Sequence, residues 1–156
     1  AILLNLLRVY KEENIQLPVT TTFAFSVFEE VGHGANSSIP SECRVLGSGY
    51  GGYGRWPSDG WIHGIHLCQR CFRTVSLRIP SAFGSLAKAQ EILISWISIL
   101  FYGSDASAAM SAGAEVKHAL LGAGIESSHS YERTHLDSVV ATERMVDAYL
   151  KSDLVD

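Results

Sequence analysis

An apolar run that ends in two adjacent carboxylates is the feature that most constrains the fold of this chain. Residues 22–28 are apolar at nearly every position and alternate between two faces, which is typical of a β-strand covered on both sides. Glu29 and Glu30 follow directly, and a glycine-containing loop comes next. In open α/β sheets, ligands bind beyond the carboxyl ends of the strands. The two glutamates therefore mark a candidate site.

The two ends of the chain alternate between helical and strand patterns. Apolar residues recur at helical spacing in residues 1–13, and Pro18 separates this expected helix from the strand at 22–28. Residues 101–113 are typical of a strand end, a Gly-Ser-Asp turn and a small-residue helix, and residues 117–124 of a short buried strand. This alternation predicts an α/β fold with a mixed sheet flanked by helices.

A loop at residues 125–134 is expected to lead into a helix that runs to the end of the chain. Thr134 and Asp137 have the spacing of a capping box at its start. The helix is expected to bury one apolar face, formed by Leu136, Val139, Val140, Val146 and Leu150.

Composition excludes several classes of protein. The 156 residues, 47% of them hydrophobic, can bury one core, so we expect a single domain. The net charge of −4 and the lack of a basic cluster argue against nucleic-acid binding. The apolar start is interrupted by Asn5 and Arg8 and is too short to span a membrane. Three closely spaced cysteines form no disulfide framework, and we expect a cytoplasmic protein.

Residues 43–100 differ from the rest of the chain. They hold all three cysteines and all three tryptophans, but only two of the sixteen acidic residues, Asp59 and Glu91. Their glycine-rich stretch lacks a phosphate-loop pattern. The order of this piece is doubtful, although residues 91–100 could form a strand or a helix.

Three groups of residues are candidates for chemistry. In the first, one of Glu29 and Glu30 would bind a metal ion and the other would act as a general base toward metal-activated water. The alternative is a solvated pair of acids at a strand end.

The second candidate is the loop around His129, whose imidazole could bind a zinc-like ion. The alternative is an exposed polar loop in which Glu132 and Arg133 are merely solvated. Asp105 follows another strand, where it could hold a ligand through a hydrogen bond or cap the next helix; local pattern favours the cap.

The third candidate is a cluster that could complete a zinc knuckle, formed by His63, His66, Cys68 and Cys71. Four ligands within nine residues leave little chain to wrap a tetrahedral ion. This cluster supports the alternative function, a noncatalytic metal-binding or interaction module.

The outer pieces resemble a known family. The stretch LPVTTTFAFSVFEEVGHGAN resembles the Glu-Glu-Val-Gly motif region of the dinuclear-metal aminopeptidases of metallopeptidase family 42, which includes glutamyl and tetrahedral aminopeptidases and proteins once labelled cellulases. YGSDASAAMSAG and GIESSHSYERTHLDSV resemble the final strands of that family. The run from His129 to Asp137 is similar to a subgroup associated with osmoprotectant systems. The resemblance covers residues 1–42 and 101–151.

The resemblance implies the C-terminal part of a zinc-peptidase-like (phosphorylase/hydrolase-like) catalytic domain that removes N-terminal residues from peptides. It implies two divalent ions, Zn²⁺ or Co²⁺, and assembly into homo-oligomers. Glu29 matches the general base, Glu30 and His129 match metal ligands, and Asp105 matches an acid that supports the site.

The chain also departs from the family pattern. The family supplies an earlier His and a bridging Asp from a segment upstream of Ala1, and a further acidic ligand downstream of the Glu pair, where Asp59 is a poor substitute. We therefore expect an incomplete ligand set and no turnover by the isolated chain. Family-like residues stop near Glu42 and resume near Tyr102, which is consistent with residues 43–100 being read out of frame.

Overall fold

A computed structural model describes residues 1–36, 39, 43–51, 65–68, 78–97, 103–127 and 129–153. Ten helices and strands occur in these ranges: α1 (Ile2–Glu12), the 3-10 helix η1 (Glu29–Val31), β1 (Arg44–Gly51), β2 (Ile65–Cys68), α2 (Arg78–Ala89), β3 (Ile94–Ile97), α3 (Asp105–Ser111), β4 (Lys117–Glu126), β5 (Arg133–Thr134) and α4 (Leu136–Leu150). The helices expected near residues 1–13 and after Ser104, and the buried strand at 117–124, are confirmed.

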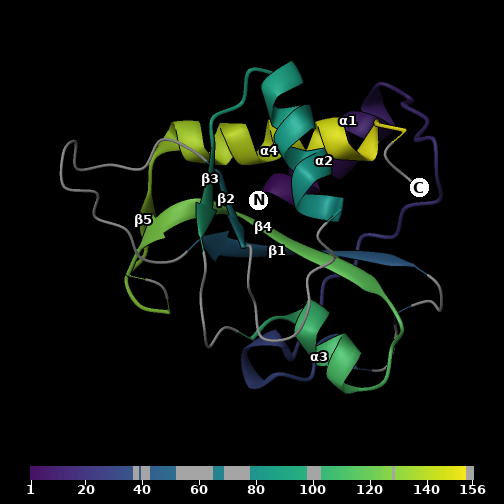
Figure 1. Ribbon diagram of the computed structural model, residues 1–156, viewed down its shortest axis with the longest axis vertical. Coiled ribbons are helices and arrows are strands. Elements are labelled where there is room, and N and C mark those ends of the chain that lie inside the picture. The colour runs from purple at the N-terminus through teal and green to yellow at the C-terminus, as the bar shows by residue number, and fades with distance from the viewer. Residues whose placement is uncertain are drawn as a thin grey trace.

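The strands form one mixed sheet in the order β1-β4-β2-β3, and β5 pairs with the end of β4. β4 lies parallel to β1 and antiparallel to β2, while β2 and β3 are parallel. Figure 1 shows α1, α2 and α4 on one side of this sheet and α3 on the other. The prediction of a mixed sheet flanked by helices is therefore confirmed.

The main core lies between β4 and the three helices of one layer. Alternate residues of β4 point to opposite faces, so Ala119 and Leu121 join this core while Leu120 packs with Ala106 of α3 on the other face. The buried residues that complete the main core are Leu6, Tyr10, Phe83, Ala87, Ile92, Met145 and Val146. Tyr10 also donates a hydrogen bond to Asp147 (2.7 Å), which joins α1 to α4.

The predicted apolar face of α4 is partly wrong. Val146 is buried, but Leu136 is 71% exposed and Val140 is 48% exposed. The helix instead buries Ser138 and Thr142, together with Met145. Two hydroxyls are tolerated there because both are hydrogen-bonded: Ser138 Oγ accepts from the Gly124 amide (2.8 Å), and Thr142 Oγ1 donates to the Ser138 carbonyl (2.7 Å).

The expected start of α4 is also displaced by one residue. His135 is the N-cap, and its side chain accepts a hydrogen bond from the Asp137 amide (3.2 Å). Thr134 lies in β5, where its hydroxyl donates to the Gly124 carbonyl (2.6 Å). The bond to β4 therefore replaces the capping role predicted for Thr134.

Residues 22–28 do not form the predicted strand. They are irregular, and residues 24–28 are exposed rather than covered on both sides. Val27 has 86% and Phe28 63% of its surface accessible. Strands require a hydrogen-bonded neighbour, and this segment pairs with none of the five described strands.

The described helices include none with the length and apolar character needed to cross a bilayer.

Candidate functional site

Glu29 and Glu30 lie in a single 3-10 turn rather than at a strand end. The Gly32 amide donates to the Glu29 carbonyl (2.9 Å), and the His33 amide donates to the Phe28 carbonyl (3.0 Å). Gly32 ends the turn with φ at 74°, a left-handed conformation that glycine adopts without strain. The turn therefore presents both carboxylates at the surface from a backbone fixed by local hydrogen bonds.

His129 reaches this turn from a distant part of the chain. Its Nδ1 lies 3.0 Å from Glu30 Oε2, with both side chains more than half exposed. The loop between β4 and β5 that carries His129 has positive φ at two non-glycine residues, Ser127 (62°) and His129 (61°). Such conformations cost energy and persist only where surrounding contacts impose them.

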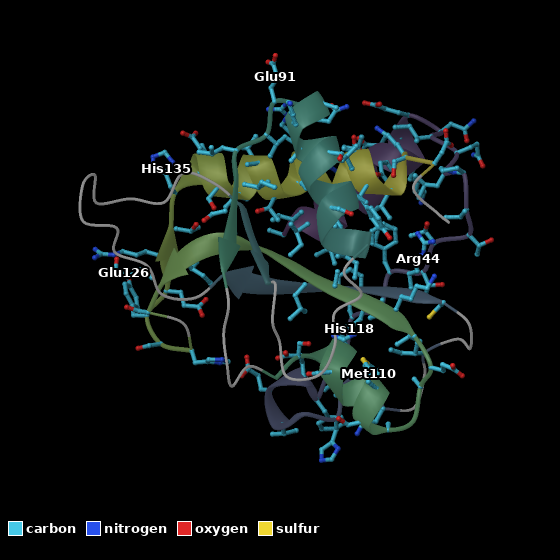
Figure 2. All side chains as sticks on the ribbon, viewed as in Figure 1. Arg44, Glu91, Met110, His118, Glu126 and His135 are labelled. Atoms are coloured by element: carbon cyan, nitrogen blue, oxygen red, sulfur yellow. The ribbon has the colours of Figure 1, made fainter. Side chains whose placement is uncertain are left out.

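Glu132 helps to impose this loop conformation. Its Oε1 accepts a hydrogen bond from the His129 amide (2.9 Å), and Ser130 donates its amide to the Ser127 carbonyl (2.9 Å). Arg133 forms an ion pair (2.5 Å) with Glu126, the last residue of β4. Glu126 is labelled in Figure 2. The alternative in which Glu132 and Arg133 are merely solvated is therefore wrong.

Asp105 is the first residue of α3 and not its cap. Ser104 is the N-cap and forms a reciprocal capping box with Ser107, so the favoured capping role of Asp105 is wrong. One carboxylate oxygen of Asp105, Oδ2, accepts a hydrogen bond from Ser26 Oγ (2.5 Å). The other, Oδ1, is buried without a hydrogen-bond partner among the described residues.

The electrostatics of Glu29 reflect this gathering of acids. Although Glu29 lies at the surface, partial loss of hydration raises the pKa of its carboxyl, and the negative charges of Glu30 and Asp105 raise it further. The nearby His129 acts in the opposite direction and lowers it. A carboxylate with a raised pKa is better suited to hold a proton than an ordinary surface glutamate.

The donor set fits a divalent cation in type but not in number. Glu30 and His129 place a carboxylate oxygen and an imidazole nitrogen side by side, and both are ordinary zinc ligands. Within the described ranges, no group of three or more His, Cys, Asp or Glu side chains is arranged to hold a metal ion. Asp105 Oδ1, which has no hydrogen-bond partner among the described residues, is a further oxygen beside the turn that a water or an ion can satisfy.

The third candidate cluster lies largely beyond the described residues. His63 and Cys71 fall outside them, and for His66 and Cys68 only the backbone of β2 is described. Cys43 is a half-buried free thiol just before β1.

Ser26 and Gly34 were missed as parts of the site by sequence reasoning. Both contact the Asp105 carboxylate, Ser26 by its hydroxyl and Gly34 by close backbone approach. The only signal in the sequence is the small size of both residues on either side of the Glu pair.

His118 is a buried histidine that the sequence did not single out. It is 1% exposed on β4, and neither ring nitrogen has a hydrogen-bond partner in the described part of the chain. Figure 2 shows it on the side of the sheet that carries α3 and Met110. Burial lowers its pKa, because a charged imidazolium would lose its hydration there.

This burial predicts a loss of stability in mild acid. At pH values between the lowered folded-state pKa and the ordinary value of 6.5, the unfolded chain binds the proton and the folded chain does not. The contribution of neutral His118 to the free energy of unfolding should have its full value above pH 6.5 and should decrease as the pH falls below 6.5. Urea unfolding from about pH 8 to about pH 5, where histidines titrate, measures this dependence.

A matched pair of variants isolates the buried imidazole. His118→Phe should flatten the dependence on pH, whereas His33→Gln, at an exposed histidine, should leave it as it is. An unchanged dependence in His118→Phe would assign the effect to other groups.

The sequence profile of the M42 glutamyl aminopeptidase family matches residues 68–145, which is half of the chain. The chain belongs to this family. The resemblance to metallopeptidase family 42 is thus confirmed, and M42 proteins are metal-dependent peptidases. The match begins at Cys68, inside the atypical middle piece. The out-of-frame reading of residues 43–100 stays a prediction. The assignment to the osmoprotectant-associated subgroup also stays a prediction.

Relatives of this M42 chain are consistent with that assignment. It is 35% identical to YhfE of Bacillus subtilis (strain 168), a proposed aminopeptidase, over 99% of this chain and 45% of YhfE.

Solved structures share the fold of the M42 chain. The TET aminopeptidase from the marine sediment archaeon Thaumarchaeota archaeon SCGC AB-539-E09 matches with a TM-score of 0.84 at 18% identity, over 97% of this chain and 46% of that one. The Pyrococcus horikoshii TET1 peptidase, which can assemble into a tetrahedron or a large octahedral shell, matches with a TM-score of 0.60 at 21% identity, over 81% and 39%. The chain thus spans less than half the length of each of these relatives.

Proposed function

We propose that this chain carries part of the active site of a dinuclear-metal aminopeptidase that removes N-terminal residues from peptides. In this proposal Glu29 is the general base, Glu30 and His129 bind metal, and Asp105 supports the site. The observation that carries it is the 3.0 Å approach of His129 to Glu30, because these residues lie on separate segments and meet beside Glu29.

The chemistry follows from the residue types. Glu30 and His129 would hold a divalent cation, Zn²⁺ or Co²⁺ in the family resemblance, which would polarise the scissile carbonyl and lower the pKa of water. Glu29 accepts a proton from the attacking water and passes it to the leaving amine. Glu30 and His129 would bind the cation and fix its position. Glu29 is not a ligand and is therefore free to accept and release the proton.

The isolated chain is expected to show no turnover. Two ligands rarely hold a catalytic ion tightly, and catalytic zinc sites use three protein ligands. The remaining ligands would come from residues outside the described set or from a longer protein.

Metal titration tests the division of roles. Replacing either ligand, by Glu30→Gln or His129→Asn, should weaken Co²⁺ binding at least about 10-fold, the lower end of what loss of a mere supporting partner costs. Glu29→Gln should change the affinity far less, because the base does not bind the ion. Glu13→Gln at the end of α1 is the matched control, and isothermal titration calorimetry gives the affinities.

The same titration distinguishes the proposed function from the alternative function. A noncatalytic module would bind metal through the cluster that contains His63, His66, Cys68 and Cys71. Its binding would be lost in Cys68→Ser and Cys71→Ser and kept in Glu30→Gln. That pattern would overturn the peptidase proposal for this chain.

We also propose that the protein forms homo-oligomers in the cytoplasm and takes peptides as substrates. The fold shared with the TET1 peptidase, which can assemble into a tetrahedron or a large octahedral shell, supports the oligomer. Analytical ultracentrifugation tests it, and a monomer at all concentrations would contradict it.

The out-of-frame origin of residues 43–100 is a separate proposal. Resequencing the coding DNA from well upstream of Ala1 through residue 102, read in all three frames, tests it. A second frame that restores an acidic strand after the Glu pair would support it, and a confirmed frame would overturn it.

A further inference from the structure

A hydrogen bond joins the segment before the Glu pair to α3. Ser26 lies three residues before Glu29, and its hydroxyl donates to Asp105 Oδ2 (2.5 Å) across 79 positions of sequence. A hydroxyl bound to a carboxylate is a charge-assisted hydrogen bond, which is among the stronger types.

The segment after the Glu pair approaches the same carboxylate. A Cβ added to Gly34 would collide with Asp105 Oδ1 and with the Ser26 side chain, 2.7 Å from Ser26 Cβ. Only glycine permits this approach, because any side chain would push the segment away. Ser26 and Gly34 therefore bring the two ends of the turn to one carboxylate, and Glu29 and Glu30 lie between them.

Asp105 offers a fixed point for this contact. Ala106 and Ala109 of α3 are fully buried, with Ala106 packed against Leu120 of β4, and the capping box of Ser104 fixes the start of the helix. The turn itself contributes little apolar packing, since residues 24–33 are all exposed. Its position thus depends on polar contacts of this kind.

We propose that Ser26 is a positioning residue for Glu29 and Glu30 and acts through its hydrogen bond to Asp105. The backbone of Gly34 packs against the same carboxylate. We name this contact the Ser26–Asp105 clasp. The proposal rests on the proposed function, because it assigns the clasp the task of holding the base and one metal ligand in place. Ser26 touches neither metal nor substrate in this role.

The first measurement is Co²⁺ affinity. Ser26→Ala should weaken it about 10-fold, as loss of a supporting partner does for metal sites. Ser26→Thr, which keeps the hydroxyl, should restore it. The Ser26→Ala/Asp105→Ala double variant should bind Co²⁺ no more weakly than whichever single variant has the lower affinity. The reason is that each substitution breaks the same hydrogen bond. Thr22→Ala, at an exposed hydroxyl upstream, is the control.

The second measurement does not depend on metal. The amides of Gly32 and His33 close the turn, so hydrogen exchange at these positions should be faster in Ser26→Ala than in the wild type and in Thr22→Ala. If the wild-type chain binds Co²⁺ no more tightly than Glu30→Gln, the assignment of Glu30 as a ligand fails, while amide exchange still decides whether the clasp holds the turn. If the wild type binds Co²⁺ and Ser26→Ala changes neither affinity nor exchange, the clasp is overturned and the proposed function stands.

Discussion

Glu29→Gln should reduce aminopeptidase turnover by a factor of about 10²–10⁴, the usual contribution of a general base. Glutamine has nearly the same shape as glutamate but cannot accept the proton from water. The assay uses a chimera in which residues 1–36 and 103–153 of this chain replace the aligned segments of YhfE, and it measures hydrolysis of an aminoacyl-nitroanilide.

Two controls make this result specific to Glu29. Glu13→Gln in the same chimera removes a carboxylate at the end of α1 and should leave turnover unchanged. Co²⁺ affinity measured in parallel should survive in Glu29→Gln, which separates loss of the base from loss of the metal. Full activity of the Glu29→Gln chimera would remove this residue from the proposed mechanism.

The largest effect on stability is expected for Leu121→Ala. Leu121 is 2% exposed on β4 and packs in the main core beneath the helical layer. Truncation removes apolar contacts and leaves a cavity, so unfolding should become easier by about 2–5 kcal/mol. Urea denaturation monitored by circular dichroism gives the difference.

Leu93 provides the matched control. It is 69% exposed just before β3, so Leu93→Ala removes the same atoms from a solvated position and should change stability by less than about 0.5 kcal/mol. Equal losses in the two variants would contradict the placement of the core on β4.

The elements that the sequence predicted correctly are those with a local signal. The helix near the N-terminus has apolar residues at helical spacing, and β4 contains a continuous apolar run at residues 119–125. The strand predicted at residues 22–28, which does not form, has an equally strong pattern, but a strand also needs a hydrogen-bonded neighbour, and local pattern does not report one. The buried face of α4 was mispredicted for a related reason: Ser138 and Thr142 are polar, and only their hydrogen bonds in three dimensions make burial acceptable.

In the candidate site, too, the residues with a signal in the sequence were found and those that depend on tertiary contacts were missed. The resemblance named Glu29, Glu30, His129 and Asp105, and the structure brings them together; their roles stay predictions. Ser26 was missed because its partner is 79 positions away, a separation that no local pattern encodes. The middle piece contributes β1, β2, α2 and β3 to the described fold, although its composition gave little basis for predicting them.

X-ray absorption of the Co²⁺-loaded chain is the measurement that tests the central claim most directly. The account predicts a first shell of nitrogen and oxygen only, at roughly the 2.0–2.2 Å typical of imidazole and carboxylate ligands, with the imidazole signal lost in His129→Asn. A shell that contains sulfur at about 2.3 Å, unchanged in His129→Asn, would place the metal on cysteines and contradict the account.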